Sequence, residues 1–292
     1  MNFKIDLRHI KYFQAVAEEL HFKRAADKLF ISQPGLSRQI QFMEKELGVK
    51  LFERHNRKVE CTAAGKFLFE NSTKWSSTFH EVLQRTNEIG KGFTDTLRLG
   101  YVGSAMQSVI PQLLRNFQLH RPAVKFTLNE LDNSSQIVQL MNDKIDLGFV
   151  RLNKVPSAVE IKTVLKEHFC LVVPSNFHLT KDKLLSMTSL KEESFILFEK
   201  DYSPTYFEEV MSLFIDSGFS PIISHSSVNA LTIFKMVENG FGLAVVPQSL
   251  KNNFNMNIKF IELDHFPQRT NLKIVWKKNS TNSLVQSVLD VL

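Results

Sequence analysis

One short helix, expected over residues 33–47, separates its apolar and polar side chains onto opposite sides. The apolar residues recur at steps of four, three and four, and they are Leu36, Ile40, Met43 and Leu47. The residues left on the other side are Gln33, Ser37, Arg38 and Gln41. Arginine can form two hydrogen bonds with guanine, and glutamine can do the same with adenine. This spacing therefore favours contact with DNA base edges, although a polar helix face is more commonly only solvated.

A second helix must hold this polar face in place. Residues 22–47 read as two short helices joined by a tight turn, and Ala25 and Ala26 are small enough to let the helices cross closely. Ser32 stands where an N-cap belongs, and Pro34 falls in the first turn, where a missing N–H costs nothing. The free N–H groups of this helix start can hold a phosphate.

Charge and a possible wing strengthen the DNA interpretation. Residues 1–66 hold 13 Lys and Arg against 8 Asp and Glu, a net charge of +5, which leaves +1 of the total +6 for the rest of the chain. Basic side chains release counterions from DNA and supply affinity that does not depend on sequence. Strands are expected at 49–52 and 59–62, with a basic tip over 53–58. Arg54, Arg57 and Lys58 can then reach the backbone or the minor groove.

The run from Leu7 to Gly65 resembles the N-terminal winged helix-turn-helix of LysR-type transcriptional regulators. It includes LRHIKYFQAVAEELHFKRAADKLFISQPGLSRQIQFMEKELGVKLFER and CTAAG. The resemblance implies DNA contact at the matching positions, which are Ser32, Gln33, Pro34, Ser37, Arg38, Gln41 and Arg54. Gly35 departs from the pattern, which more often has proline there, and this departure is expected to loosen the helix start.

A long helix without proline is expected from Ala63 to Ile89. Its stripe at steps of four and three, a period of 3.5 residues, is Leu68, Ser72, Trp75, Phe79, Val82, Thr86 and Ile89. This period is typical of a coiled-coil seam, whereas the alternative is a helix packed on its own domain. We favour self-association, with dimerisation by Leu68, Trp75, Phe79, Val82 and Ile89. The resemblance agrees, since the corresponding helix in that family pairs two subunits.

Strands and helices alternate after residue 94, which is typical of βαβ units. The first series has strands at 96–102, 124–131 and 146–150 and helices at 108–119 and 135–142. The second has strands at 169–173, 195–198, 222–225 and 242–246 and helices at 205–217 and 230–239. A last strand, 272–276, and a last helix, 283–292, return to the first lobe according to the resemblance.

The predicted fold class is therefore α+β overall. We expect an N-terminal winged helix-turn-helix over residues 1–62, a linker and dimerisation helix over 63–92, and a two-lobed α/β effector domain over 93–292 that is similar to periplasmic binding proteins. Lobe I would comprise about 93–166 and 269–292, and lobe II about 167–268.

Three corners of these lobes carry hydroxyl or amide groups at helix starts, where free N–H groups favour anions. They are marked by Ser104, by Asn133 and Ser134, and by Thr205 and Tyr206. Each alone can be an ordinary helix cap, but together they favour a pocket for a small carboxylate. Phe198 and Tyr206 can stack on a ring. Arg151 can serve a second anion site, or it can equally be a surface charge.

YVGS and GFVRL resemble the effector-domain pattern of the regulators of aromatic-compound catabolism within the LysR family. By this resemblance Ser104, Asn133, Thr205 and Tyr206 fall at that group's primary effector positions. The resemblance thus implies an aromatic ligand.

The sequence gives little support for an enzymatic function. The nine histidines never fall within four residues of one another, and Cys61 and Cys170 show no CxxC spacing, so we expect no metal and no cofactor. Ser104 in GYVGSAM lacks the following glycine of a nucleophile elbow. The start of the chain lacks the apolar core of a signal peptide, and no run of about eighteen apolar residues can span a membrane, so a cytoplasmic protein is expected.

We predict an effector-responsive, sequence-specific DNA-binding transcriptional regulator and no enzyme. The expected partners are double-stranded operator or promoter DNA, a small anionic effector, further copies of the chain and RNA polymerase, with no membrane. The copies would form a dimer through the linker helix and, by the resemblance, a tetramer. The alternative is an α/β solute-binding or enzyme-like protein with an appended basic domain.

Overall fold

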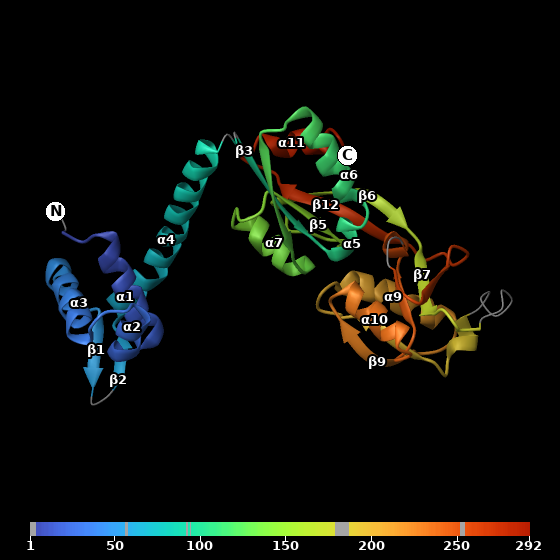
Figure 1. Ribbon diagram of the computed structural model, residues 1–292, viewed down its shortest axis with the longest axis horizontal. Helices are drawn as coiled ribbons and strands as arrows, with labels where there is room; N and C mark the ends of the chain where they lie inside the picture. The colour runs from blue at the N-terminus through green and yellow to red at the C-terminus, as the bar shows by residue number, and fades with distance from the viewer. Residues whose placement is uncertain (1–3, 56–57, 92, 94, 179–186, 252–254) are drawn as a thin grey trace. The chain divides into compact units, whose positions relative to one another are not determined.

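The computed structural model describes residues 4–55, 58–91, 93, 95–178, 187–251 and 255–292 (Figure 1). The chain divides into two compact units, Met1–Lys91 and Gly92–Leu292, and each is described by itself. No helix among the described residues is both long and apolar enough to cross a membrane.

The first unit begins with three helices packed around one core. They are α1 (Leu7–Glu19), α2 (Phe22–Lys28) and α3 (Gln33–Leu47). Ala25 and Ala26 are buried between the helices, as their small size predicts, and Leu36, Ile40 and Met43 face the same core. The Ser32 hydroxyl accepts the Gly35 N–H at 3.3 Å and caps α3. The helix therefore starts where the sequence predicts it, even with glycine at position 35.

The wing consists of the antiparallel strands β1 (Phe52–His55) and β2 (Lys58–Cys61), paired from Phe52–Cys61 to His55–Lys58. The strand predicted at 49–52 is wrong, because pairing begins only at Phe52. The buried Glu44 carboxylate accepts the N–H groups of Leu51 (2.9 Å) and Phe52 (3.2 Å), which ties this segment to α3 instead. Hence Lys58 lies in a strand, not in a six-residue tip.

Helix α4 (Ala63–Gly90) follows the wing, with the Thr62 hydroxyl accepting the Gly65 N–H at 3.0 Å. The first part of its stripe belongs to the unit's own core. Leu68 packs against that core, and the buried Ser72 hydroxyl accepts a hydrogen bond from Gln14 at 3.3 Å. Leu68 therefore contacts the unit's own core, as the alternative of packing on its own domain predicts for this end of the helix, and its place in a seam between subunits stays a prediction.

The second unit contains a first lobe built on a five-stranded sheet of order β4-β3-β5-β12-β6. Its strands are β3 (Asp95–Tyr101), β4 (Val124–Glu130), β5 (Leu147–Val150), β6 (Val159–Glu167) and β12 (Thr270–Lys277). The first three strands are parallel, whereas β12 runs antiparallel to both β5 and β6. The last strand thus returns to the first lobe, as the resemblance implies.

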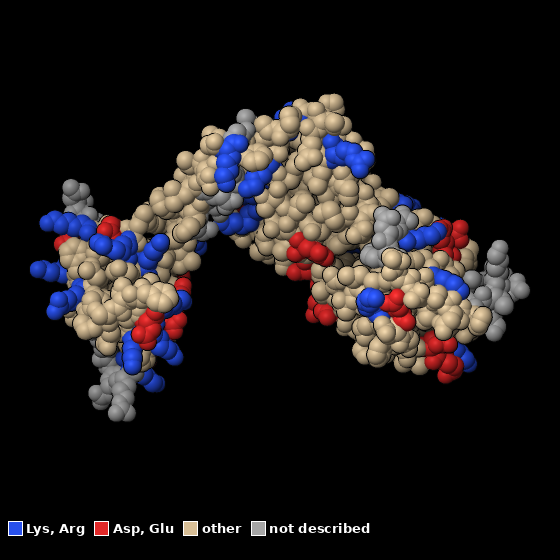
Figure 2. All heavy atoms as spheres, viewed as in Figure 1, with Lys and Arg blue, Asp and Glu red and all other residues tan. Residues whose placement is uncertain are grey.

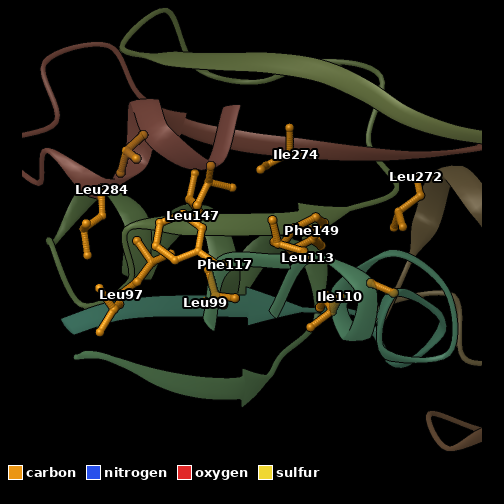
Figure 3. Close-up of a cluster of buried hydrophobic side chains, with 14 of the residues drawn as sticks. Leu97, Leu99, Ile110, Leu113, Phe117, Leu147, Phe149, Leu272, Ile274 and Leu284 are labelled. Carbon is orange, nitrogen blue, oxygen red and sulfur yellow. The ribbon is translucent and has the colours of Figure 1, made fainter. Parts of the chain in front are cut away.

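Helices cover both faces of this sheet. They are α5 (Gly103–Met106), α6 (Val109–His120), α7 (Asn133–Met141) and α11 (Leu284–Leu289). Figure 3 shows the core on one face, which contains Leu113 and Phe117 of α6, Leu284 of α11, and Leu99 and Phe149 of the sheet. Helix α7 packs on the other face through Leu140, against Val150 and Val275.

The second lobe has its own strands and helices. They are β7 (Phe169–Pro174), β8 (Ser194–Phe198), α9 (Pro204–Asp216), β9 (Ile222–Ser227), α10 (Ala230–Glu238), β10 (Ala244–Pro247) and β11 (Ile258–Glu262), with 3-10 turns η1 (Met187–Leu190) and η2 (Gln248–Lys251). Strand β7 pairs antiparallel with β10 and β11, β8 pairs parallel with β9, and a bridge between Phe195 and Leu243 links the two sheets. The predicted two-lobed α/β architecture is confirmed.

Two strands, β6 and β11, were absent from the sequence prediction. Strand β6 lies at the edge of its sheet and reads VEIKTVLKE, in which the exposed Glu160, Lys162 and Lys166 interrupt the apolar pattern. Only His168 separates β6 from β7, and the chain therefore passes from one lobe to the other within a single residue.

Candidate functional site

The polar face of α3 lies at the surface, as its spacing predicts. Gln33, Arg38 and Gln41 are exposed, Ser37 is half-buried, and Ser32 and Pro34 are exposed at the helix start. These residues therefore share one side of a helix whose other side is anchored in the core. Lys and Arg side chains gather along the edge of this unit in Figure 2, which gives the face a basic surrounding.

The basic residues of the wing are only partly described. Lys58 is exposed at the start of β2, and Arg54 lies in β1. The Arg54 side chain and all of Arg57 lie outside the described residues, so their contact with DNA stays a prediction.

The second unit holds a cavity of about 250 Å³ between its two lobes. Its aromatic walls are Tyr101, Phe198, Tyr202 and Tyr206. The polar side chains that line it are Ser104, Gln107, Glu130, Arg151, Ser203 and Asn229. Of the residues predicted to bind an effector, Ser104, Phe198 and Tyr206 thus line one cavity, and Arg151 joins them.

Arg151 is only 3 % exposed, so its alternative interpretation as a surface charge is wrong. Its guanidinium lies 2.6 Å from the Glu167 carboxylate and donates to the Thr270 hydroxyl at 2.9 Å. The same group donates to the Ser104 hydroxyl at 3.1 and 3.3 Å. Glu167 and Thr270 are paired across β6 and β12 at the lobe crossing. The arginine therefore connects the cavity to the crossing between the lobes.

Asn133 is fully buried and does not line the cavity. Its amide oxygen accepts the Arg151 N–H at 3.0 Å, and its amide nitrogen donates to the Arg151 carbonyl at 3.3 Å and to the Ser203 hydroxyl at 2.8 Å. Ser134 is exposed and Thr205 half-buried, and neither lines the cavity. Asn133 thus holds the cavity wall, while direct ligand contact by Ser134 and Thr205 finds no support in this geometry.

The aromatic rings of the cavity are fixed in place. Phe198 and Tyr206 meet edge to face with ring centroids 5.8 Å apart, and the Tyr206 hydroxyl donates to the Val245 carbonyl at 3.0 Å. The Arg151 guanidinium carbon lies 5.9 Å from the centre of the Tyr206 ring. Burial raises the pKa of the Tyr206 hydroxyl well above its ordinary value, so the ring presents a neutral face.

Sequence reasoning missed Tyr202, which connects the lobes beside the cavity. Its hydroxyl accepts the Gly103 N–H at 3.2 Å, and its carbonyl accepts the Asn133 N–H at 3.3 Å. Burial raises the pKa of Tyr202 to about 12. The signal available in the sequence was its place in KDYSPTY, three residues before Thr205.

Asn229, Gln107 and Glu130 were also missed. Asn229 caps α10 by accepting the Thr232 N–H at 3.2 Å, and Ala230 and Leu231 of that helix start line the cavity with it. The sequence signal was an asparagine directly before an apolar helical run. No comparable signal marks Gln107 or Glu130, because the fold alone brings them to the cavity.

Two family models match the chain. The model described as "Bacterial regulatory helix-turn-helix protein, lysR family" matches residues 7–66, and the model described as "LysR substrate binding domain" matches residues 90–292. Together they include both the α3 face and the cavity.

Curated relatives and solved structures agree with these models. HTH-type transcriptional regulator AlsR of Bacillus subtilis (strain 168) is 30% identical over 98% of this chain and 95% of its own length. HTH-type transcriptional regulator BenM of Acinetobacter baylyi (strain ATCC 33305 / BD413 / ADP1) is 32% identical over 89% of this chain and 86% of its own. The structure of full-length CbnR in complex with its target DNA has a TM-score of 0.75 at 25% identity and covers 98% of both chains. These relatives are transcriptional regulators and not enzymes, and the chain belongs to the LysR family of transcriptional regulators.

Proposed function

We propose that this LysR-type regulator senses a small aromatic carboxylate in the cavity between its lobes and acts on operator DNA in the cytoplasm. The observation that carries the proposal is a cavity of about 250 Å³ with four aromatic walls and one buried arginine. Aromatic walls offer a ring a large apolar contact, and a guanidinium can bind a carboxylate through two parallel hydrogen bonds. The resemblance of YVGS and GFVRL to regulators of aromatic-compound catabolism supports the same ligand class.

The carboxylate would lie between groups of both lobes. Arg151 and Ser104 belong to lobe I, and Asn229 begins α10 of lobe II, whose nine residues direct a positive dipole end toward the cavity. Since Glu167 already neutralises the guanidinium, a ligand carboxylate would first accept a hydrogen bond from the Ser104 hydroxyl, whose oxygen itself accepts from Arg151. A ligand that contacts both lobes binds the closed arrangement better than the open one, and only such a difference can shift the population.

DNA contact is proposed for the α3 face and the wing. The residues are Ser32, Gln33, Pro34, Ser37, Arg38, Gln41, Arg54, Arg57 and Lys58. Exposed base-reading side chains on a helix held by a buried core support this assignment. CbnR, whose full-length structure has been solved in complex with its target DNA, is a relative of similar fold.

Self-association through α4 is proposed for its stripe from Leu68 to Ile89, above all for the part beyond Ser72. Trp75, Val82 and Ile89 are 50 %, 55 % and 59 % exposed, and the Trp75 and Phe79 rings stack with centroids 6.0 Å apart. A helix with such a stripe gains stability by pairing with another copy. We also propose that the copies assemble into a tetramer and that the protein regulates transcription through RNA polymerase. The proposed domains are residues 1–62, 63–92 and 93–292.

A ligand screen tests the cavity. Full-length protein is heated with aromatic and dicarboxylic acids, because a ligand at about 100 times its dissociation constant stabilises the folded state by roughly 2.7 kcal/mol. Ser104→Ala should weaken the binding of a hit by about 1–3 kcal/mol, since a buried acceptor is left without its partner. Ser134→Ala is the matched control, because Ser134 is exposed outside the cavity. If Ser104→Ala and Ser134→Ala bind a hit with equal affinity, the ligand does not bind beside Ser104 and the proposed site is wrong.

A further inference from the structure

The turn between α2 and α3 presents an aromatic side chain to solvent. Phe30 is 95 % exposed, more than any other large apolar side chain among the described residues. Its neighbours Leu29 and Ile31 both pack against the helix-turn-helix core. The turn therefore exposes Phe30 to solvent, whereas Leu29 and Ile31 are anchored in the core.

The backbone of Phe30 adopts φ +54°, a left-handed conformation that bulky residues rarely adopt. Two hydrogen bonds fix this turn, from the Phe30 N–H to the Asp27 carbonyl (3.1 Å) and from the Ile31 N–H to the Ala26 carbonyl (3.1 Å). Glycine or asparagine would adopt this conformation at lower cost. The folded unit thus gains nothing from the phenyl ring, which is neither packed nor suited to its backbone.

The position of Phe30 gives the ring a different use. It lies two residues before Ser32, the N-cap of α3, and three before Gln33, the first residue of the proposed base-reading face. In a helix-turn-helix the N-terminal residues of the second helix contact base edges in the major groove. A side chain exposed in the turn directly before that helix is close enough along the chain to reach the edge of the same groove. The apolar group that the groove offers there is the methyl group of thymine, which distinguishes an A·T pair from the others.

We propose that Phe30 contacts a thymine methyl group at the edge of each operator half-site and so contributes to sequence preference. The proposal rests on DNA reading by α3 as set out above. The contact joins two apolar surfaces that are exposed in the free partners, so complex formation removes both from water. The hydrogen bonds of the turn and the packing of Leu29 and Ile31 hold this strained backbone in the folded unit, and the phenyl ring itself contributes only when DNA is bound.

The test begins with the operator. Duplexes that bind are enriched from a random-sequence pool with the full-length wild-type protein, and each thymine of the selected site is then replaced singly by deoxyuridine, which lacks only the methyl group. We expect one thymine position in each half-site to respond. A single deoxyuridine at that position should weaken wild-type binding by about fourfold, the effect of burying one methyl group. The same replacement should leave the affinity of Phe30→Asn and Phe30→Ala unchanged.

Two controls keep a folding defect from imitating this result. Phe30→Asn suits the left-handed backbone, so its melting temperature should equal or exceed that of wild type. Leu20→Asn changes another partly exposed apolar residue with positive φ, at the end of α1, and should leave operator affinity unchanged. A deoxyuridine profile that is the same in wild type and Phe30→Asn overturns the proposal, even if the variant binds all duplexes more weakly. Failure of wild type to enrich any duplex would instead contradict DNA reading by α3 itself.

Discussion

Replacement of Arg151 by methionine should strongly destabilise the second unit. Methionine keeps much of the length of the side chain but removes a buried charge that contacts Glu167 at 2.6 Å, and the carboxylate stays buried without a counter-ion. Breaking a buried ion pair from one side costs about 3–5 kcal/mol. The lower part of that range applies, because the N–H and hydroxyl of Ser249 still donate to Glu167. About 3 kcal/mol would lower the melting temperature of a unit of this size by roughly 6–12 °C.

A double-mutant cycle tests whether Arg151 and Glu167 act as one buried unit. Glu167→Gln removes the other charge and leaves the buried Arg151 guanidinium with neutral acceptors alone, among them Ser104 and Thr270. Arg151→Met combined with Glu167→Gln leaves no buried charge unpaired. The double variant should therefore be more stable than the sum of the two single effects indicates, by about 1–3 kcal/mol.

The assay is denaturant unfolding of the full-length protein without ligand, followed by hydrogen exchange of peptides from β5, β6 and β12. A control pair is Lys235 and Glu238, which lie 2.6 Å apart on the surface of α10 and should show coupling below about 1 kcal/mol. Single effects at Arg151 and Glu167 that add within about 0.5 kcal/mol would refute the view that this pair acts as one buried unit.

Three further predictions follow from other parts of the chain. Arg38→Ala should cost operator binding about 1–3 kcal/mol and relax preference at one base pair, whereas Lys58→Ala should weaken all duplexes alike; identical selection profiles for wild type and Arg38→Ala would remove the base contact. Trp75→Ala combined with Phe79→Ala should weaken the dimer and its operator binding, and an unchanged oligomer in ultracentrifugation at low micromolar concentration would contradict this. Burial raises the pKa of the Glu209 carboxyl, so the folded state holds this proton more tightly than the unfolded state and loses stability as pH rises from the group's ordinary pKa through its raised one. Glu209→Gln should remove that part of the pH dependence, and superimposable stability-against-pH curves for wild type and variant would disprove the assignment.

Local patterns predicted the first unit in detail. Two short-range signals predicted α3: the spacing of Leu36, Ile40 and Met43, and the capping residue Ser32. The helix begins after Ser32 and buries these three apolar side chains, as predicted. The wing was misplaced for a reason that no local pattern contains. The carboxylate of Glu44, on another element, takes the N–H groups that the predicted strand would have used for pairing.

The same distinction holds for the long helix. The period of its stripe predicts one apolar face, and that face exists. Periodicity cannot state what covers the face, however. Only the tertiary structure assigns Leu68 to the unit's own core and leaves Trp75, Val82 and Ile89 exposed.

The sequence by itself determined most strands and helices of the second unit, although it missed β6 and β11, and the aromatic residues Phe198 and Tyr206, because each depends on neighbours within a few positions. The alternation of these elements then gave the α/β class of the two lobes. Only the tertiary structure decided which side chains share the cavity. Tyr202 and Gly103 are 99 residues apart, and Arg151 and Thr270 are 119 apart, yet each pair is hydrogen-bonded. Such partners meet because the chain crosses twice between lobes, and the energy of a contact depends on distance in space and not on separation along the chain.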